Sequence, residues 1–267
     1  MNVMDMFSLK GKVAVVTGGY GLYGAAMTEA LAEAGAAVIT ASRSLEKNEQ
    51  FAASLREKGL EVYGDTYDQG DEQTILAFRD RVLERFGKVD VLVNNSVARG
   101  LANCGFKGDL SGFIQSITVN GAGFFAVTRA FGENMEERRS GSIINIGSYM
   151  GSLGRNPALY EGTNGTMGGW DAGDYYYHKG GMHQFTRYLA SYYGQFNVRC
   201  NCLALGGCYN GDRPQHPAFL EAYGKATFLG RMADPDDVKG IVVYLASDAS
   251  LYTTGTVIPV DGGYSAK

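Results

Sequence analysis

Short apolar runs alternate with longer amphipathic segments along the whole chain, and this alternation limits the possible folds more than any other feature. A continuous apolar run such as residues 13–16 (VAVV) is typical of a parallel strand that is covered on both faces. The sequence predicts strands at residues 13–16, 38–40, 60–63, 89–93, 142–146, 198–203 and 257–260, and helices at 25–35, 45–58, 71–86, 111–139, 175–195 and 235–245.

This order of elements predicts right-handed crossovers and a doubly wound parallel α/β sheet. The chain has 267 residues without a linker, an internal repeat or a low-complexity tract, so we expect a single domain that spans residues 1–267. Pro259 can donate no ladder hydrogen bond, and the last strand is therefore expected at an edge of the sheet.

The charge and the cysteine content narrow the class of protein. The chain carries 24 basic and 28 acidic residues and no long basic block, which argues against a nucleic-acid partner. The N-terminus does not look like a secretion signal, and no apolar run reaches the ~18 residues that span a bilayer. Four cysteines are too few for a disulfide scaffold, and no two of the three histidines share a helix face. We expect a soluble, cytoplasmic protein without a metal site or a membrane partner.

A glycine-rich turn follows the first predicted strand, where residues 17–24 read TGGYGLYG. Gly18, Gly21 and Gly24 would permit a tight turn, a close approach of a pyrophosphate to the backbone and close helix–strand packing. The phosphates would then lie at the positive end of the following helix, with Tyr20 and Leu22 beside them. Between a strand and a helix at the start of such a sheet, this turn predicts dinucleotide binding and a Rossmann fold.

The end of the second predicted strand bears on the choice of cofactor. An acidic residue at this place would hold the ribose diol of NAD, but residues 40–43 read TASR. The guanidinium of Arg43, next to Ser42, can fork onto a 2′-phosphate, which favours NADP and leaves NAD possible. The alternative is that Arg43 is a solvated surface residue.

Three consecutive tyrosines precede a lysine in residues 173–181, GDYYYHKGG. Reduction of a ketone by hydride needs a proton donor beside the forming alkoxide, and a phenol serves near neutrality only if its pKa falls from ~10. A lysine on the same helix face, four positions further on, supplies this bias. Tyr175 has Lys179 at that spacing, whereas Tyr176 and Tyr177 have glycines. Tyr175 is therefore the candidate acid/base, although a chance pair stays possible.

At this point the chain resembles the short-chain dehydrogenase/reductase (SDR) family over nearly its whole length. Several spaced motifs in one order carry the resemblance. Besides the glycine turn and the Tyr175–Lys179 pair, they are Gly64-Asp65-Thr66, Asn94-Asn95-Ser96, Val119-Asn120, Ile146-Gly147-Ser148 and the C-terminal runs 229–231 (LGR), 245–248 (LASD), 254–255 (TG) and 260–263 (VDGG).

The resemblance implies an NAD(P)-dependent oxidoreductase with a four-residue catalytic site. Tyr175 would be the acid/base, and Ser148 would hydrogen bond the carbonyl or alkoxide oxygen. Lys179 would hold the nicotinamide ribose and lower the pKa of the tyrosine, while Asn120 would orient a water molecule in a proton relay. Beyond the glycine turn, cofactor contacts are implied for Ser42, Arg43, Asp65, Thr66, Asn94, Ser96, Tyr175, Lys179, Gly206 and Cys208.

The sequence departs from the family pattern at three places. The glycine spacing is similar to the form common in sugar-nucleotide epimerases and dehydratases. The usual Pro-Gly after the sixth strand is replaced in residues 205–207 (LGG). Finally, Ser148 and Tyr175 lie 27 positions apart, where about a dozen is usual in the family, and this indicates an insertion at about 149–174.

The insertion is expected to form a loop over the substrate pocket, because both its ends adjoin predicted catalytic residues. Its aromatic and acidic residues suit a sugar or polyol, and we expect Tyr160, Glu161 and Trp170, together with Ser148, to contact the substrate, with Asp171 as a further hydroxyl acceptor. A plain surface loop is the alternative.

The sequence thus predicts interconversion of a ketone and a secondary alcohol on a sugar-like or polyol substrate. One alternative is a sugar-nucleotide epimerase or dehydratase that keeps its nicotinamide cofactor tightly bound, and another is a non-catalytic dinucleotide-binding module. The resemblance also implies a homodimer or homotetramer that assembles through the two long helices, 111–139 and 175–195, and the C-terminal strand.

Overall fold

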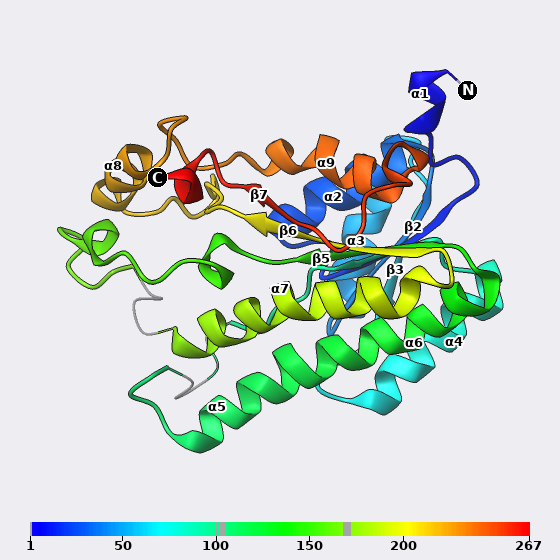
Figure 1. Ribbon diagram of the computed structural model, residues 1–267, viewed down its shortest axis with the longest axis horizontal. Helices are drawn as coiled ribbons and strands as arrows, with labels where there is room; N and C mark the ends of the chain where they lie inside the picture. Colours follow the sequence, from blue (N-terminus) through cyan, green and yellow to red (C-terminus); the bar gives the residue numbers. More distant parts are fainter. Residues whose placement is uncertain (1, 100, 102–104, 168–171) are drawn as a thin grey trace.

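The computed structural model describes residues 2–99, 101, 105–167 and 172–267 as a parallel sheet with helices on both faces (Figure 1). The seven strands follow the order β3-β2-β1-β4-β5-β6-β7, and every pairing is parallel. They are β1 (Val13–Thr17), β2 (Ala37–Ser42), β3 (Val62–Thr66), β4 (Val91–Asn94), β5 (Gly141–Ile146), β6 (Val198–Leu205) and β7 (Val257–Val260). The predicted doubly wound, single-domain Rossmann fold is confirmed.

The strand order reverses between β1 and β4, and in such sheets ligands bind at this switch point, outside the carboxyl ends of the strands. The strand β7 lies at one edge of the sheet, beside β6, as the proline within it predicts. In register, Pro259 is opposite Ala204.

Helices cover the sheet in two layers, each with its own apolar core. One core lies under α2 (Leu22–Glu33), α3 (Leu45–Arg56) and α9 (Lys239–Ala246), the helices above the sheet in Figure 1. The other lies under α4 (Glu72–Phe86), α6 (Gly123–Arg138) and α7 (Gly173–Gly194). The remaining α-helices are α1 (Val3–Met6), α5 (Leu110–Ile117) and α8 (Pro217–Ala226).

Several helices differ from their predicted bounds, and two of these differences lie at positions that bear on the site. The helix after the glycine turn begins at Leu22, not at 25, because Gly21 already serves as its extended N-cap residue. The long helix predicted at 111–139 consists of α5 and α6, joined by a π-helical turn at Thr118–Ala122. Such π turns are frequent at functional sites, because they re-aim a side chain within an otherwise regular helix.

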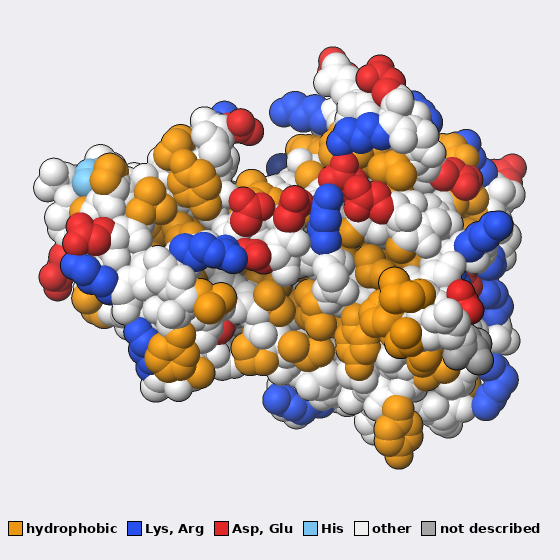
Figure 2. All heavy atoms as spheres, turned by 90° about the horizontal axis from the view of Figure 1, so that it is seen from above, with side chains coloured by type: hydrophobic (Ala, Val, Ile, Leu, Met, Phe, Trp, Pro, Cys, Tyr) orange, Lys and Arg blue, Asp and Glu red, His pale blue; other side chains and the backbone are white. Residues whose placement is uncertain are grey.

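A third apolar cluster holds the predicted insertion against α8. Its buried members are Tyr149, Leu159, Phe219, Tyr223 and Met232. The insertion contributes two short 3-10 turns, Tyr149–Gly151 and Pro157–Tyr160. This part of the chain lies with α8 at the left end of the molecule in Figure 1, and the same end projects from the main body in Figure 2.

Candidate active site

Tyr175 is placed by the first turn of α7 beside two cations and a hydroxyl. The Arg99 Nη2 atom donates a 2.9 Å hydrogen bond to the phenol oxygen, and the Lys179 ammonium nitrogen lies 5.7 Å from the centre of the ring. Burial by itself disfavours the phenolate. The charges of Lys179 and Arg99, together with a hydrogen bond from Ser148, outweigh this effect, and they hold the pKa of Tyr175 below its ordinary value of 10.0.

The two neighbouring tyrosines face different surroundings. Burial, and then the phenols of Tyr160 and Tyr264, raise the pKa of Tyr176 to about 12. Tyr177 is 65% exposed, and its ring meets that of Phe113 edge-on at 5.5 Å. Of the three tyrosines, Tyr175 is thus the one with Arg99 and Lys179 beside its phenol.

Two further catalytic candidates, Lys179 and Ser148, lie at the carboxyl end of β5. The buried Lys179 donates to the carbonyl oxygen of Ile146, the last residue of β5, and burial lowers the pKa of its ammonium group. Ser148 follows two residues later, is buried, and caps the 3-10 turn by accepting a 3.2 Å hydrogen bond from the Met150 N–H. Helix α7 and strand β5 thereby bring Ser148, Tyr175 and Lys179 together.

Asn120 lies in the π-helical turn and joins this cluster indirectly. Its amide accepts a hydrogen bond from the Ala98 N–H at 2.8 Å and donates one to the Ala98 carbonyl at 3.0 Å. The same amide nitrogen donates to Ser116 Oγ at 3.2 Å, and Ser116 donates to the buried carboxylate of Asp174, next to Tyr175. Asn120 thus fixes the loop after β4 and is linked to the start of α7.

Two residues of this arrangement were not foreseen from the sequence, Arg99 and Ser116. Arg99 stands five positions after Asn94, the last residue of β4, and so at the ligand-binding edge of the sheet. That position was the signal that could have identified it. Ser116 carries no such signal, because a serine within a helix is usually a surface residue.

The glycine turn has the close packing that was expected, and one more glycine takes part. Gly18 adopts a left-handed conformation with φ +65°, and a Cβ atom on Gly24 would overlap the Gly18 carbonyl oxygen. A Cβ atom on Gly19 would overlap the Thr40 and Thr28 hydroxyls, so Gly19 is needed where α2 packs on β2. This role of Gly19 was not predicted.

Asn95 holds the glycine turn in place, a role that was not predicted from the sequence. Its side-chain amide donates to the carbonyl oxygens of Thr17 at 3.0 Å and Gly18 at 2.9 Å. Tyr20 and Leu22 are exposed on the same turn and line an open hollow of about 450 Å³ between α2 and α3. The turn is therefore a preformed backbone cradle with two side chains at its rim.

The neighbouring ends of β2 and β3 carry the other predicted adenosine contacts. Arg43 is exposed, and no side chain in the described part of the chain forms an ion pair or a hydrogen bond with it. Ser42 accepts a 2.9 Å hydrogen bond from Asn48, and Thr66 donates to the Ser42 carbonyl at 3.0 Å. The Asp65 carboxylate is turned towards α4, where it accepts hydrogen bonds from Arg81 Nη2 at 2.7 Å and Nε at 3.1 Å.

Of the other predicted cofactor contacts, Asn94 is directed away from the crevice. Its amide nitrogen donates to Thr128 Oγ1 and to Asn145 Oδ1, both at 2.9 Å, in the buried layer between β4, β5 and α6. This side chain therefore braces β4 against its neighbours and does not reach out towards a ligand. Ser96, two residues later, accepts a 3.1 Å hydrogen bond from Tyr67.

The loop after β6 is held from two sides. The Gly206 carbonyl accepts a 3.2 Å hydrogen bond from Tyr23 on α2, and the Gly207 N–H donates to the Tyr223 hydroxyl on α8. Cys208 is buried, and its burial raises the pKa of the thiol to about 11. Backbone atoms of residues 206–208, more than the thiol, are therefore suited to meet a ligand.

The predicted substrate residues fall into two groups. Tyr160 is half-buried, with its ring 5.5 Å from that of Phe219, and Glu161 is exposed. Trp170 and Asp171 lie outside the described residues. Tyr264, near the C-terminus, was not foreseen, but its ring lies 4.5 Å from that of Tyr149 and its hydroxyl accepts a 3.2 Å hydrogen bond from Asn156.

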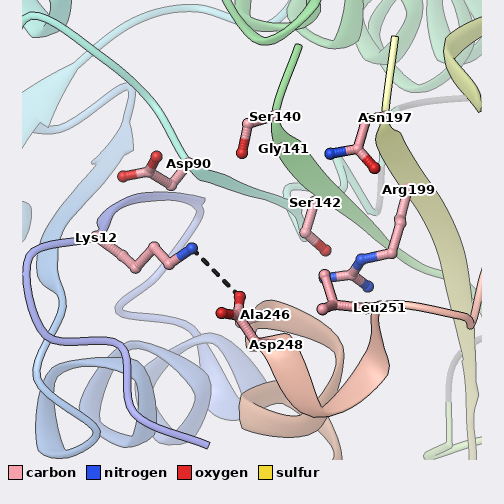
Figure 3. A pocket seen from close by; sticks show the side chains of 10 residues that line it. All are labelled: Lys12, Asp90, Ser140, Gly141, Ser142, Asn197, Arg199, Ala246, Asp248 and Leu251. Atoms are coloured by element: carbon pink, nitrogen blue, oxygen red, sulfur yellow. Dashed lines mark hydrogen bonds and ion pairs between the residues drawn. The ribbon is translucent and has the colours of Figure 1, made fainter. Parts of the chain in front are cut away.

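A second polar pocket lies at the opposite end of the sheet. It encloses about 40 Å³ between the amino ends of β5 and β6, the start of β1 and the segment after α9 (Figure 3). Lys12 Nζ and Asp248 Oδ1 are 3.4 Å apart across it, and Arg199 donates to the carbonyl oxygens of Leu245 and Ser247. These contacts tie the sheet to α9 and are remote from Tyr175. Within the described residues, no three His, Cys, Asp or Glu side chains are grouped as metal ligands.

Comparison with known proteins places this chain in one family. The family model described as enoyl-(acyl carrier protein) reductase matches residues 23–265. The chain belongs to the short-chain dehydrogenase/reductase family of NAD(P)-dependent oxidoreductases, which confirms the resemblance seen in the sequence.

Individual relatives cover almost the whole chain. The galactitol 2-dehydrogenase of Rhizobium johnstonii is 31% identical over 275 residues, with 99% of each chain covered. The NADP-dependent mannitol dehydrogenase of Hypocrea jecorina is 32% identical, covering 99% of this chain and 96% of that protein. The crystal structure of a gluconate 5-dehydrogenase from Burkholderia cenocepacia J2315, in complex with NADP and tartrate, superimposes with a TM-score of 0.87 at 28% identity over the full length of both chains.

Proposed function

We propose that this oxidoreductase uses NADP to interconvert a ketone and a secondary alcohol on a sugar-like or polyol substrate. The observation that carries the proposal is the Tyr175 phenol, whose pKa is lowered by Lys179 and Arg99 beside Ser148 at the carboxyl edge of the sheet. The galactitol, mannitol and gluconate dehydrogenases among the relatives support the substrate class.

The residues at the switch point fit a phosphorylated dinucleotide. In the glycine turn Gly18 adopts a left-handed conformation, and Gly24 lets α2 begin close to the turn. Arg43 stands exposed after β2, with neither a carboxylate partner among the described residues nor an acidic neighbour in residues 40–43. A guanidinium in this position matches a 2′-phosphate. When bound, the nicotinamide ring accepts or donates the hydride.

We infer the following roles for the chain's own side chains during oxidation. The Tyr175 phenolate accepts the proton of the substrate hydroxyl, and the Ser148 hydroxyl donates a hydrogen bond to the same oxygen as negative charge develops there. Lys179 keeps the phenol ionisable through its charge. Asn120 holds the loop that carries Arg99 and, through Ser116, the start of α7. In the direction of reduction, the phenol of Tyr175 returns the proton.

We also propose that residues 149–174 close the substrate pocket. Support comes from the described part of the segment, which is packed on α8 through Leu159 and Tyr160, and from Tyr176, whose phenol is close enough to those of Tyr160 and Tyr264 to be influenced by them. A wall of phenols offers both apolar faces and hydroxyl groups, a combination that suits the alternating C–H and O–H surface of a sugar.

For the assembly, we propose a cytoplasmic homodimer or homotetramer. The segment 110–138 is long and apolar enough to cross a membrane by composition alone, but Phe124, Phe131 and Met135 within it belong to the core. Its exposed apolar side, like that of α7, suits a subunit interface better. Figure 2 shows further apolar side chains on the face that carries α9 and β7.

The test is turnover of NADP and of NAD, by the wild type and by Arg43→Ala, against polyols, sugar acids, small ketones and acyl thioesters. We expect activity with NADP on at least one polyol or sugar acid. Loss of a charged hydrogen bond in Arg43→Ala should weaken the binding of NADP by about 10- to 100-fold and the binding of NAD much less. Absence of turnover with every carbohydrate substrate, in the presence of activity on acyl thioesters, would overturn the substrate class. If the wild type and Arg43→Ala each used NADP and NAD equally well, the proposed role of Arg43 would be wrong.

A further inference from the structure

Arg99 contacts the candidate acid/base and still has hydrogen-bonding capacity to spare. Its Nη2 atom donates to the Tyr175 hydroxyl at 2.9 Å, and its guanidinium carbon lies 4.8 Å from the centre of the same ring. The side chain is exposed, and the described residues provide no carboxylate to pair with it. A guanidinium has several N–H donors in a planar fork, and within the described residues only Nη2 donates a hydrogen bond, so the other donors are available to a ligand.

The backbone that carries Arg99 is firmly held. Asn120 grips the N–H and the carbonyl of Ala98, the preceding residue, with hydrogen bonds of 2.8 and 3.0 Å. Asn120 is itself 4% exposed and is held in turn by Ser116. The guanidinium is therefore carried by an anchored residue beside the candidate acid/base. Because this residue is already held in place, it loses little conformational entropy when a ligand binds.

The charges around Tyr175 are the reverse of those of the whole chain. The net charge of the chain is −4, yet the two charged side chains that most influence the Tyr175 phenol are the cations Lys179 and Arg99. The neighbouring carboxylate, Asp174, is buried and accepts a hydrogen bond from Ser116. A local excess of positive charge in a partly enclosed site attracts anions.

We propose that Arg99 binds a carboxylate group of the substrate, and that the protein therefore acts on sugar acids or related hydroxy acids in preference to neutral polyols. This inference rests on the proposed function and makes its substrate class more specific. The planar fork matches a carboxylate in a two-point contact, while the reacting hydroxyl lies between Tyr175 and Ser148. The same guanidinium would thus orient the substrate and favour the ionised phenol.

The experiment compares D-gluconate with galactitol in the wild type, Arg99→Gln, Arg99→Lys and the control Arg85→Gln. Arg85 lies on α4 over the ring of Tyr63, so its substitution removes the same charge away from the site. We expect Arg99→Gln to raise KM for gluconate about 10- to 100-fold and to leave KM for galactitol nearly unchanged. Arg99→Lys should recover part of the loss, because it keeps the charge without the fork.

Two results would overturn the assignment. If Arg99 acted only through the charge it places beside Tyr175, Arg99→Gln would lower kcat for both substrates equally and move the pH profile without changing their KM ratio. Efficient turnover of galactitol but not of gluconate by the wild type would also refute it, while leaving the proposed function standing.

A binding measurement separates failure of this inference from failure of the proposed function. In the presence of NADP, gluconate should raise the melting temperature of the wild type and of Arg85→Gln, but not that of Arg99→Gln. If no polyol or sugar acid is turned over, the proposed function fails, and this measurement still decides whether Arg99 binds a carboxylate. Equal stabilisation of all the variants would show that it does not.

Discussion

The phenol of Tyr175 and the ammonium group of Lys179 stabilise each other's charged form. Burial alone raises the pKa of the phenol and lowers that of the ammonium group, and the opposite charge of the partner counteracts each effect. For the phenol the counteraction prevails, because Arg99 adds a second positive charge and Ser148 a hydrogen bond. Lys179 alone, four positions along the helix, would lower the pKa of the phenol less.

This arrangement predicts the pH dependence of the reaction. Oxidation needs the phenolate, so kcat/KM for the alcohol should rise with pH to a plateau, with a midpoint below 10, and Lys179→Met should move that midpoint upwards. Steady-state kinetics from pH 6 to 11 (roughly the span around a free phenol's pKa) measure the two midpoints.

Tyr175→Phe should lower kcat by about 10²- to 10⁴-fold, whereas Tyr176→Phe should retain most activity. The same steady-state kinetics measure this difference. An inactive Tyr176→Phe beside an active Tyr175→Phe would contradict it.

The turn between β1 and α2 packs as a unit, in which a Cβ atom at Gly19 or Gly24 would overlap neighbouring atoms. Gly24 brings the first turn of α2 against the Gly18 carbonyl, and the Asn95 amide holds that carbonyl from the side of β4. The conformation of this turn thus depends on contacts between two elements that are far apart in the sequence.

We predict that Gly24→Ala destabilises the protein by about 1–3 kcal/mol, since the added methyl group overpacks a rigid backbone contact. It should also weaken NADP binding. Gly154→Ala is the matched control, because a Cβ atom there has nothing within 4 Å and the residue does not have a positive φ. Urea unfolding and cofactor titration measure the two effects. An equal loss in both variants would mean that the close approach is unimportant.

At the scale of the whole molecule, one helix layer is more apolar on its outside than a monomer requires. Tyr188 is 57% exposed on α7 and stacks on Phe185 at 5.5 Å, while Phe125 is 46% exposed on α6. The series of aromatic contacts on this layer continues from Tyr188 to Tyr192 and Phe196, so the surface is contiguous. A contiguous apolar surface of this kind indicates a protein–protein contact.

We expect Tyr188→Glu to dissociate the assembly, because it places a charge at the centre of that surface. Sedimentation velocity at micromolar concentration should show an oligomer for the wild type and smaller species for the variant. Leu45→Glu is the control, because Leu45 is equally exposed but lies on α3, on the other face of the sheet. A wild type that sediments as a monomer would remove the basis of the proposed assembly.

The sequence by itself determined the sheet, its edge strand and the acid/base candidate. These depend on local patterns: apolar runs of strand length, glycines at a strand–helix junction, the missing N–H of Pro259, and the helical spacing of Tyr175 and Lys179. The start of α2 and the π-helical turn at Asn120 were not predicted, because both depend on how a helix end meets its neighbours.

Only the tertiary structure decided which polar groups face the pocket. Nothing local distinguishes Asn94, which braces the buried layer, from Asn95, which holds the glycine turn, since the two adjacent side chains point to opposite sides of the chain. Arg99 reaches Tyr175 across 76 positions of sequence because β4 ends and α7 begins at the same edge of the sheet. The direction of a side chain and its proximity to residues far away in the sequence both result from packing, and a sequence pattern contains neither.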